Sequence, residues 1–173
     1  MPDLVPDLMP EPADLDWRDG VIPVSTRFDD PYFSLNDGLS ETRHVFLAGN
    51  RLQDRLRDGF HVAELGFGTG LNLLALQILW GQMGAPGTLR FTSFEAFPMA
   101  PADMAQALDH FPEARAVAGP LLAQWGAGWQ GADAVRMSLP GLEAEIRLGD
   151  ARETLPAWTG QADAWFLDGF SPA

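Results

Sequence analysis

The sequence predicts an α/β fold in which helices flank a Rossmann-like parallel sheet. Short apolar runs that suit buried strands alternate with helical stretches across residues 60–167, and this alternation is typical of parallel sheets. Glycines gather at residues 66–70, where the first strand gives way to a helix. Acidic residues stand at the ends of the strands, where open parallel sheets bind their ligands. The fold class therefore also predicts where a site lies.

The elements can be placed in order along the chain. Residues 21–40 suit short extended pieces and turns, and a helix is expected to open at Ser40 and to be interrupted near Gly49. Proline breaks the helical stretch 101–124 into two pieces. The remaining elements are strands at 60–65, 89–94, 144–148 and 162–167, and helices at 71–80 and 151–158.

The domain organisation follows from composition. Residues 1–20 predict an acidic, proline-rich arm without periodicity. Residues 21–173 predict one domain, made of an N-terminal cap at 21–58 and a cofactor-binding α/β part at 59–173. The sequence stops directly after the fourth expected strand, whereas a doubly wound sheet normally continues. The last strands are therefore expected to be missing, which leaves the fourth strand as an uncovered apolar edge.

Composition excludes several classes of protein. The chain has no cysteine, and its three histidines show no ligand spacing, so no metal site is predicted. It has no signal peptide and no apolar run of the ~18 residues that a membrane span needs, which predicts a cytoplasmic protein without membrane contact.

The formal net charge of −13 argues against non-specific nucleic-acid binding. Arginines nevertheless gather at positions 43, 51, 55 and 57. This cluster is either a solvated helix face or a local patch that contacts phosphates, and the sequence leaves both open.

The glycine loop favours S-adenosylmethionine over a nicotinamide dinucleotide. A dinucleotide fingerprint starting at Gly66 requires a third glycine at position 71, which is Leu71. The observed run instead places Glu64 ahead of Gly66, Gly68 and Gly70, which is the methyltransferase form of the loop. Glu64 can then meet the ammonium group of the methionine moiety, often through water. A purely structural turn is the alternative.

Three further acids predict the rest of a cofactor site. Glu95 ends the second strand and can accept hydrogen bonds from the ribose hydroxyls. Asp150, followed by Ala151, ends the third strand and can accept from the adenine amino group. Asp168 ends the fourth strand and faces the site of methyl transfer. Taken singly, each acid is equally well a helix cap or a solvated charge; their joint placement indicates the site.

Six runs of sequence make the prediction more specific. They are residues 28–34, 38–43, 45–50, 64–72, 94–98 and 163–170. In these runs the chain resembles the methyltransferase domain of the bacterial bifunctional MnmC tRNA-modifying enzymes and their stand-alone relatives. The resemblance extends from about residue 15 to the last residue, and the combination of GFGTGLN with DAWFLDGF is its most specific part.

The resemblance implies a class I methyltransferase fold and a particular reaction. A methyl group passes from S-adenosylmethionine to the primary amine of 5-aminomethyl-2-thiouridine, at the wobble position of tRNA. The product is 5-methylaminomethyl-2-thiouridine. No metal is implied, and FAD is implied only for a separate oxidoreductase domain or partner, which nothing in this chain resembles.

The resemblance also implies roles for individual residues. Asp168 orients the amine or receives its proton. Tyr32 and Phe33 can stack on the uridine base, with core packing as the alternative. The implied cofactor-binding residues are Glu64, Gly66, Phe67, Gly68, Thr69, Gly70, Asn72, Glu95, Asp150 and Ala151. The implied substrate-binding residues are Asp30, Tyr32, Phe33, Arg43, Asn50 and Phe170.

One departure from the family leaves alternatives open. The family's fourth-strand motif continues into a lysine-asparagine-proline stretch, which is missing after Ala173. The chain is then a fragment or a degenerate copy. The alternatives are a methyltransferase acting on another amine and a non-catalytic cofactor-binding module, while a nicotinamide dehydrogenase is disfavoured by Leu71.

Overall fold

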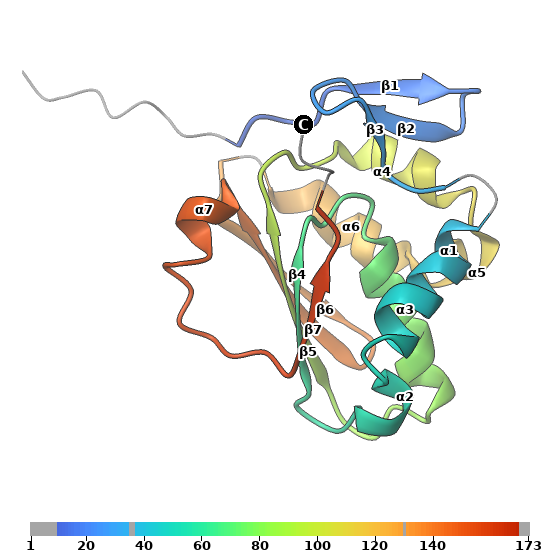
Figure 1. Ribbon diagram of the computed structural model, residues 1–173, viewed down its shortest axis with the longest axis vertical. Coiled ribbons are helices and arrows are strands. Elements are labelled where there is room, and N and C mark those ends of the chain that lie inside the picture. The colour runs from blue at the N-terminus through green and yellow to red at the C-terminus, as the bar shows by residue number, and fades with distance from the viewer. Residues whose placement is uncertain (1–9, 35–36, 130, 170–173) are drawn as a thin grey trace, which may run out of the picture.

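The computed structural model describes residues 10–34, 37–129 and 131–169. A five-stranded sheet in the order β6-β7-β5-β4-β8 forms its centre (Figure 1). Four strands are parallel, and β6 runs antiparallel to β7. The strands are β4 (His61–Leu65), β5 (Leu89–Glu95), β6 (Ala134–Leu139), β7 (Leu142–Leu148) and β8 (Ala164–Leu167).

A second, smaller antiparallel sheet lies beyond the carboxyl ends of the parallel strands (Figure 1). It consists of β1 (Leu15–Arg18), β2 (Ile22–Ser25) and β3 (Asp30–Pro31). Residues 15–18, which the sequence assigned to the arm, therefore form a strand paired with β2. The backbone hydrogen bonds of this pairing, together with the packing of Leu15 and Trp17 against the core, order the segment.

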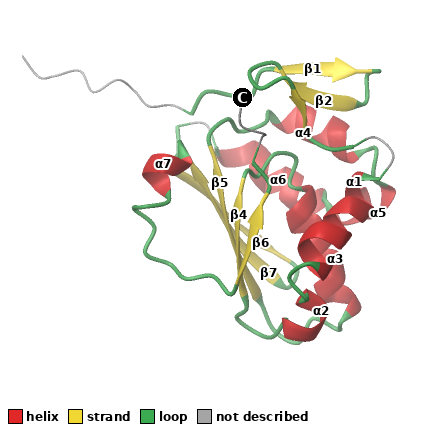
Figure 2. Ribbon diagram, in the orientation of Figure 1, coloured by secondary structure: helices red, strands yellow, loops and turns green. Residues whose placement is uncertain are grey.

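Figure 2 shows α3 to α6 gathered on one side of the large sheet and α7 on the other. The segment 101–128 forms three helices instead of the predicted two, because a proline stands in the first turn of both α5 and α6. The helices are α1 (Gly38–Thr42), the π-helix η1 (Arg43–Ala48), α2 (Leu52–Arg55), α3 (Leu71–Gln82), α4 (Pro101–Leu108), α5 (Pro112–Val117), α6 (Gly119–Gly128) and α7 (Ala151–Thr154).

The core lies between the sheet and these helices. α3 is apolar nearly all round, and its residues 71–77 are all buried, because α3 contacts α1, η1 and α5 as well as lying over the sheet. Val62 and Phe166 come from the two neighbouring strands β4 and β8 and are fully buried. This packing fixes where β4 ends and α3 begins, and so fixes the glycine loop between them.

Two sequence predictions need correction, one about the direction of the strands and one about the length of a helix. The sheet is mixed, not purely parallel, because residues 134–139 form β6, whose residues alternate between buried and more exposed. The helix expected at 151–158 ends at Thr154. The prediction that the fourth strand lies at an edge is confirmed: β8 pairs only with β4 among the described strands, and Leu167 is 69% exposed.

In the described part of the chain, no helix has the length and apolar character needed to span a membrane.

Candidate cofactor and active site

A cavity of about 1470 Å³ lies at the carboxyl ends of the parallel strands. Its walls come from the small sheet, α1, the glycine loop, the ends of β5, β7 and β8, and α7. Small-molecule sites usually measure about 300–1,000 Å³, so this cavity can hold a cofactor together with part of a second reactant.

The glycine loop requires glycine at Gly66 and Gly68 for two reasons. Both residues have positive φ, of 86° and 54°, which L side chains rarely adopt. A Cβ on Gly66 would lie 2.7 Å from the carbonyl oxygen of Asp168, and one on Gly68 would lie 3.1 Å from the ring of Tyr32. The bare backbone therefore lets β8 and Tyr32 approach closely, and the start of α3 behind the loop presents backbone amides to a ligand.

Glu95 holds the glycine loop at the end of β5. Its Oε2 accepts from the backbone N–H of Gly68 at 2.9 Å, and its Oε1 accepts from that of Phe97 at 2.8 Å. Burial raises the pKa of Glu95, and the backbone N–H donors act in the opposite direction. Glu95 lines the cavity, so its carboxylate is placed for the predicted bonds to ribose hydroxyls, which it would share with the backbone N–H groups that act on it.

Glu64 differs from the sequence prediction. It is fully buried, and its oxygens accept from the Asn72 side-chain amide at 2.8 Å and from the Ser93 hydroxyl at 2.7 Å. It does not line the cavity. The side chain points into the protein and offers no direct contact to a ligand in the cavity, so a link to the ammonium group through water stays a prediction. Burial raises the pKa of Glu64 well above its usual range.

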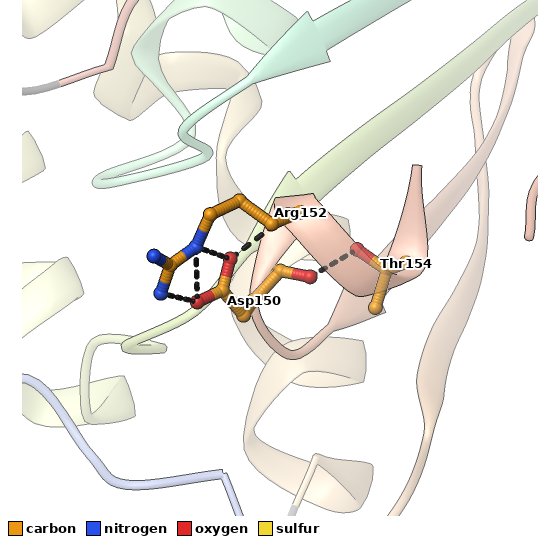
Figure 3. A network of polar contacts seen from close by, with 3 residues as sticks. All are labelled: Asp150, Arg152 and Thr154. Carbon is orange, nitrogen blue, oxygen red and sulfur yellow. Dashed lines mark hydrogen bonds and ion pairs between the residues drawn. The ribbon is translucent and has the colours of Figure 1, made fainter. Parts of the chain in front are cut away.

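Asp150 is the N-cap residue of α7 and forms hydrogen bonds with its neighbour Arg152. It caps the helix by accepting from the backbone N–H of Arg152, and the Arg152 guanidinium folds back onto both carboxylate oxygens (Figure 3). These bonds hold the pKa of Asp150 at about 2. Asp150 and Ala151 line the cavity as predicted. The contact with adenine stays a prediction, and it requires Asp150 to share an oxygen with Arg152.

Asp168 lies at the end of β8 beside the glycine loop. Its Oδ2 accepts from the Asn72 amide at 2.7 Å. The residue as a whole is exposed, yet its carboxyl lies against the buried amide, and the loss of water around it raises its pKa to about 6, with a smaller contribution from Glu41. A carboxyl that titrates near neutral pH suits proton transfer.

The remaining cofactor residues divide by their surroundings. Thr69 is buried at the cavity wall, and Gly70 begins α3 with a positive φ of 77°. The ring of Phe67 packs against Trp125 at 5.1 Å between centroids, so Phe67 can offer a ligand mainly its backbone. Asn72 reaches the cavity, but both of its N–H groups are directed at carboxylates.

The implied substrate residues are only partly brought together. Asp30 and Tyr32 line the cavity, and burial followed by the charge of Glu95 raises the pKa of Tyr32. Phe33 also lines the cavity, but it is 8% exposed and packs edge-on against Phe111 at 4.8 Å, so core packing explains it better than base stacking.

Two of the other three implied substrate residues, Arg43 and Asn50, lie away from the cavity. Arg43 pairs with Glu113, and Asn50 donates to the carbonyl oxygens of Phe46 and Trp165; neither lines the cavity. These two residues hold the cap to its neighbours. Phe170 lies outside the described residues.

The arginine cluster is largely structural. Arg55 donates to the carbonyl oxygens of Asn50 and Asp163, and Arg57 pairs with the Asp163 carboxylate. Arg51 remains 76% exposed in its side chain, with an ion pair to Asp54 at 3.6 Å. These bonds favour a structural role for Arg55 and Arg57, and the local phosphate-contacting patch stays a prediction that rests mainly on Arg51.

Charge gives the cavity its chemical character. The arginines on its walls, Arg27 and Arg152, each form an ion pair with an acid. Because both wall arginines are paired and the remaining charged wall residues are acids, the cavity attracts cations. In the described part of the chain no cluster of histidine and acidic residues is arranged to hold a metal ion. The acidic residues on the walls are Glu11, Asp30, Glu41, Glu95, Asp133, Asp150, Glu153 and Asp168.

Sequence reasoning missed the residues that organise these acids. The Thr42 hydroxyl donates a hydrogen bond to the side chain of Asn72, and the Ser93 hydroxyl donates one to the side chain of Glu64. Glu41 contributes a charge that acts on Asp168. Thr42 and Glu41 do fall in one of the family-like runs, which was the available signal; Ser93 lies outside these runs.

Comparison with known proteins agrees with this geometry. Residues 112–173 match the model of a family described as S-adenosyl-L-methionine-dependent methyltransferase. The chain is 48% identical over 94% of its length to the tRNA 5-methylaminomethyl-2-thiouridine biosynthesis bifunctional protein MnmC of Caulobacter vibrioides. It is 46% identical over 93% of its length to the MnmC protein of Pseudomonas fluorescens. The chain spans 28% and 25% of the lengths of these two relatives.

The fold is also found among solved structures. The crystal structure of MNMC2 from Aquifex aeolicus superposes with a TM-score of 0.63 at 24% identity, over 94% of this chain and 50% of that one. The predicted fold class and the family resemblance are confirmed.

Proposed function

We propose that this chain, whose sequence and fold are those of an MnmC-like methyltransferase domain, transfers a methyl group from S-adenosylmethionine to a primary amine. The amine is that of 5-aminomethyl-2-thiouridine in tRNA, and the product is 5-methylaminomethyl-2-thiouridine. One observation carries the proposal: the glycine loop, Glu95 and Asp168 converge on a single acidic cavity.

The residues present fit S-adenosylmethionine. Residues 66–69 of the glycine loop line the cavity, and the start of α3 lies behind them. Glu95 would hold the ribose, Asp150 and Ala151 would lie along the adenine, and the acidic walls suit a ligand with a sulfonium and an ammonium group. When bound, the cofactor supplies an electrophilic methyl group.

Asp168 would act on the amine. A primary alkylammonium must lose a proton before its nitrogen can attack, and a carboxylate with a pKa of about 6 is ionised at neutral pH and can accept it. The carboxylate would also orient the nitrogen in line with the methyl group. Positioning two bound reactants is worth about 7–11 kcal/mol in favourable systems, so much of the acceleration would come from the shape of the cavity.

The tRNA substrate rests on the names of the relatives. With a net charge of −13, the chain would recognise the wobble nucleotide locally and not through its overall charge. The reaction would take place in the cytoplasm, and a flavin-dependent oxidoreductase domain or partner would supply the amine, as the resemblance implies.

Two assays test the proposal. Calorimetry with S-adenosylmethionine, S-adenosylhomocysteine and NAD should show binding of the first two and no comparable signal from NAD. Methylation of tRNA that carries 5-aminomethyl-2-thiouridine should then be compared with methylation of free 5-aminomethyl-2-thiouridine and of a simple alkylamine. Equal rates on all three acceptors would favour a methyltransferase of broader amine specificity.

A further inference from the structure

We propose that Asn72 is a positioning residue, which orients the carboxylate of Asp168 toward the amine and keeps it ionised. This inference rests on the proposed function, because it assigns Asn72 a part in that reaction. It replaces the cofactor contact that the sequence implied for Asn72, since the amide of this side chain is already directed elsewhere.

The hydrogen bonds of Asn72 account for its whole amide group. Its Nδ2 donates to Glu64 Oε1 at 2.8 Å and to Asp168 Oδ2 at 2.7 Å, which uses both N–H donors. Its Oδ1 accepts from the Thr42 hydroxyl at 2.9 Å. Turning the amide over would place its oxygen against two carboxylates. The Thr42 hydroxyl, which donates to that oxygen, further holds the observed orientation.

Asn72 also joins parts of the chain that the site needs together. It lies in the first turn of α3, while Asp168 follows β8, Glu64 lies on β4 and Thr42 ends α1. Asn72 is buried. Unlike the exposed residue Asp168, it is therefore a fixed point from which the carboxylate can be held.

Charge around Asp168 makes this bond important. The charged neighbour that acts on Asp168 is an acid, Glu41 of α1, which raises its pKa, and the charge of Asp168 in turn raises the pKa of Glu64. Glu95 of β5 in turn raises the pKa of Glu64. The N–H of Asn72 opposes these effects by lowering the pKa of Asp168. Without it, Asp168 would hold its proton to higher pH.

The test replaces Asn72 with leucine, which has a similar shape and no donor. A hydrogen bond to a charged group affects a titration by about one to two pH units. Carboxyl-carbon NMR of the full chain, with Asp168 assigned by the D168N variant, should show the Asp168 midpoint moving upward by that amount. The acid limb of the single-turnover methylation rate should move by the same amount, with the rate recovering at high pH.

A matched control is available on the same helix. Gln77 is another buried amide of α3, and its Nε2 lies 3.5 Å from the Pro140 carbonyl oxygen, away from Asp168. Gln77→Leu should leave both the midpoint and the acid limb in place. If Asn72→Leu does not fold, Thr42→Val, which removes the hydroxyl that holds the Asn72 oxygen at 2.9 Å, should give a smaller shift in the same direction.

The outcomes separate the two proposals. A parent chain that does not methylate the tRNA contradicts the proposed function, whereas the NMR midpoint still reports on Asn72. A parent that methylates, together with an Asn72→Leu variant whose rate falls equally at every pH and whose Asp168 midpoint is unmoved, overturns the positioning role. In that case Asn72 only supports the fold.

Discussion

Replacing Glu95 with glutamine should weaken cofactor binding without unfolding the protein. The two carboxylate oxygens of Glu95 accept from the backbone N–H groups of Gly68 at 2.9 Å and Phe97 at 2.8 Å, and those of Phe67 and Ala96 also lower its pKa. A glutamine has a single acceptor oxygen, so its NH₂ group must face one of these N–H donors. The variant therefore loses a charge-assisted bond that holds the loop and one acceptor for the ribose.

The size of this effect follows from the bonds that are lost. A hydrogen bond to a charged group contributes about 1.5–3 kcal/mol, which corresponds to a roughly ten- to hundredfold loss of affinity. Stability at neutral pH should change less, because burial already disfavours the charged form of Glu95.

Calorimetry with S-adenosylhomocysteine measures the affinity, and urea unfolding checks the fold. Glu153→Gln is the matched control, since Glu153 is an exposed acid on the same cavity wall. If the Glu95 variant binds as tightly as the parent, the ribose role is wrong. If the Glu153 variant weakens binding equally, general charge explains the effect.

Three further changes test other parts of the site. Asp168→Asn should slow single-turnover methylation about 10²–10⁴-fold with little change in cofactor affinity; a rate near that of the parent would leave Asp168 as a strand ending. Glu64→Gln should flatten the pH dependence of stability. Burial raises the folded-state pKa of Glu64 above 4.5, so the stability that Glu64 contributes at low pH is lost as the pH rises from 4.5 through its folded-state pKa. Urea unfolding at several pH values measures this loss, and the same dependence of stability on pH in parent and variant would contradict the prediction. Arg51→Glu should weaken tRNA binding and reduce its salt slope by about one, whereas the equally exposed Arg136→Glu on β6 should not; equal effects would place the RNA elsewhere.

Sequence reasoning located the parts of the fold that depend on continuous apolar runs. β4, β5 and α3 were expected within two residues of their observed bounds, because a buried parallel strand and a helix packed on several sides are apolar throughout. β1 and β6 were missed. β1 has only four residues, of which Leu15 and Trp17 pack against the core, and β6 has only an alternating pattern with one buried face.

The site was predictable in position but not in detail. Acids at the strand ends indicated the cavity, since parallel strands end at one edge. The sequence could not show that Glu64 points inward while Glu95 lines the cavity, because this depends on which side chains meet. The bond between Asn72 and Asp168 joins residues 96 positions apart, and the arginine pairs likewise depend on tertiary contacts that spacing does not reveal.

The most direct test of the central claim follows the methyl group itself. The chain is incubated with S-adenosylmethionine that carries an isotopically labelled methyl group and with tRNA that contains 5-aminomethyl-2-thiouridine, and the digested nucleosides are analysed by mass spectrometry. We predict labelled 5-methylaminomethyl-2-thiouridine, formed at least about 10²-fold faster by the parent than by Asp168→Asn. A folded parent chain that binds the cofactor and yields no labelled nucleoside would contradict the account.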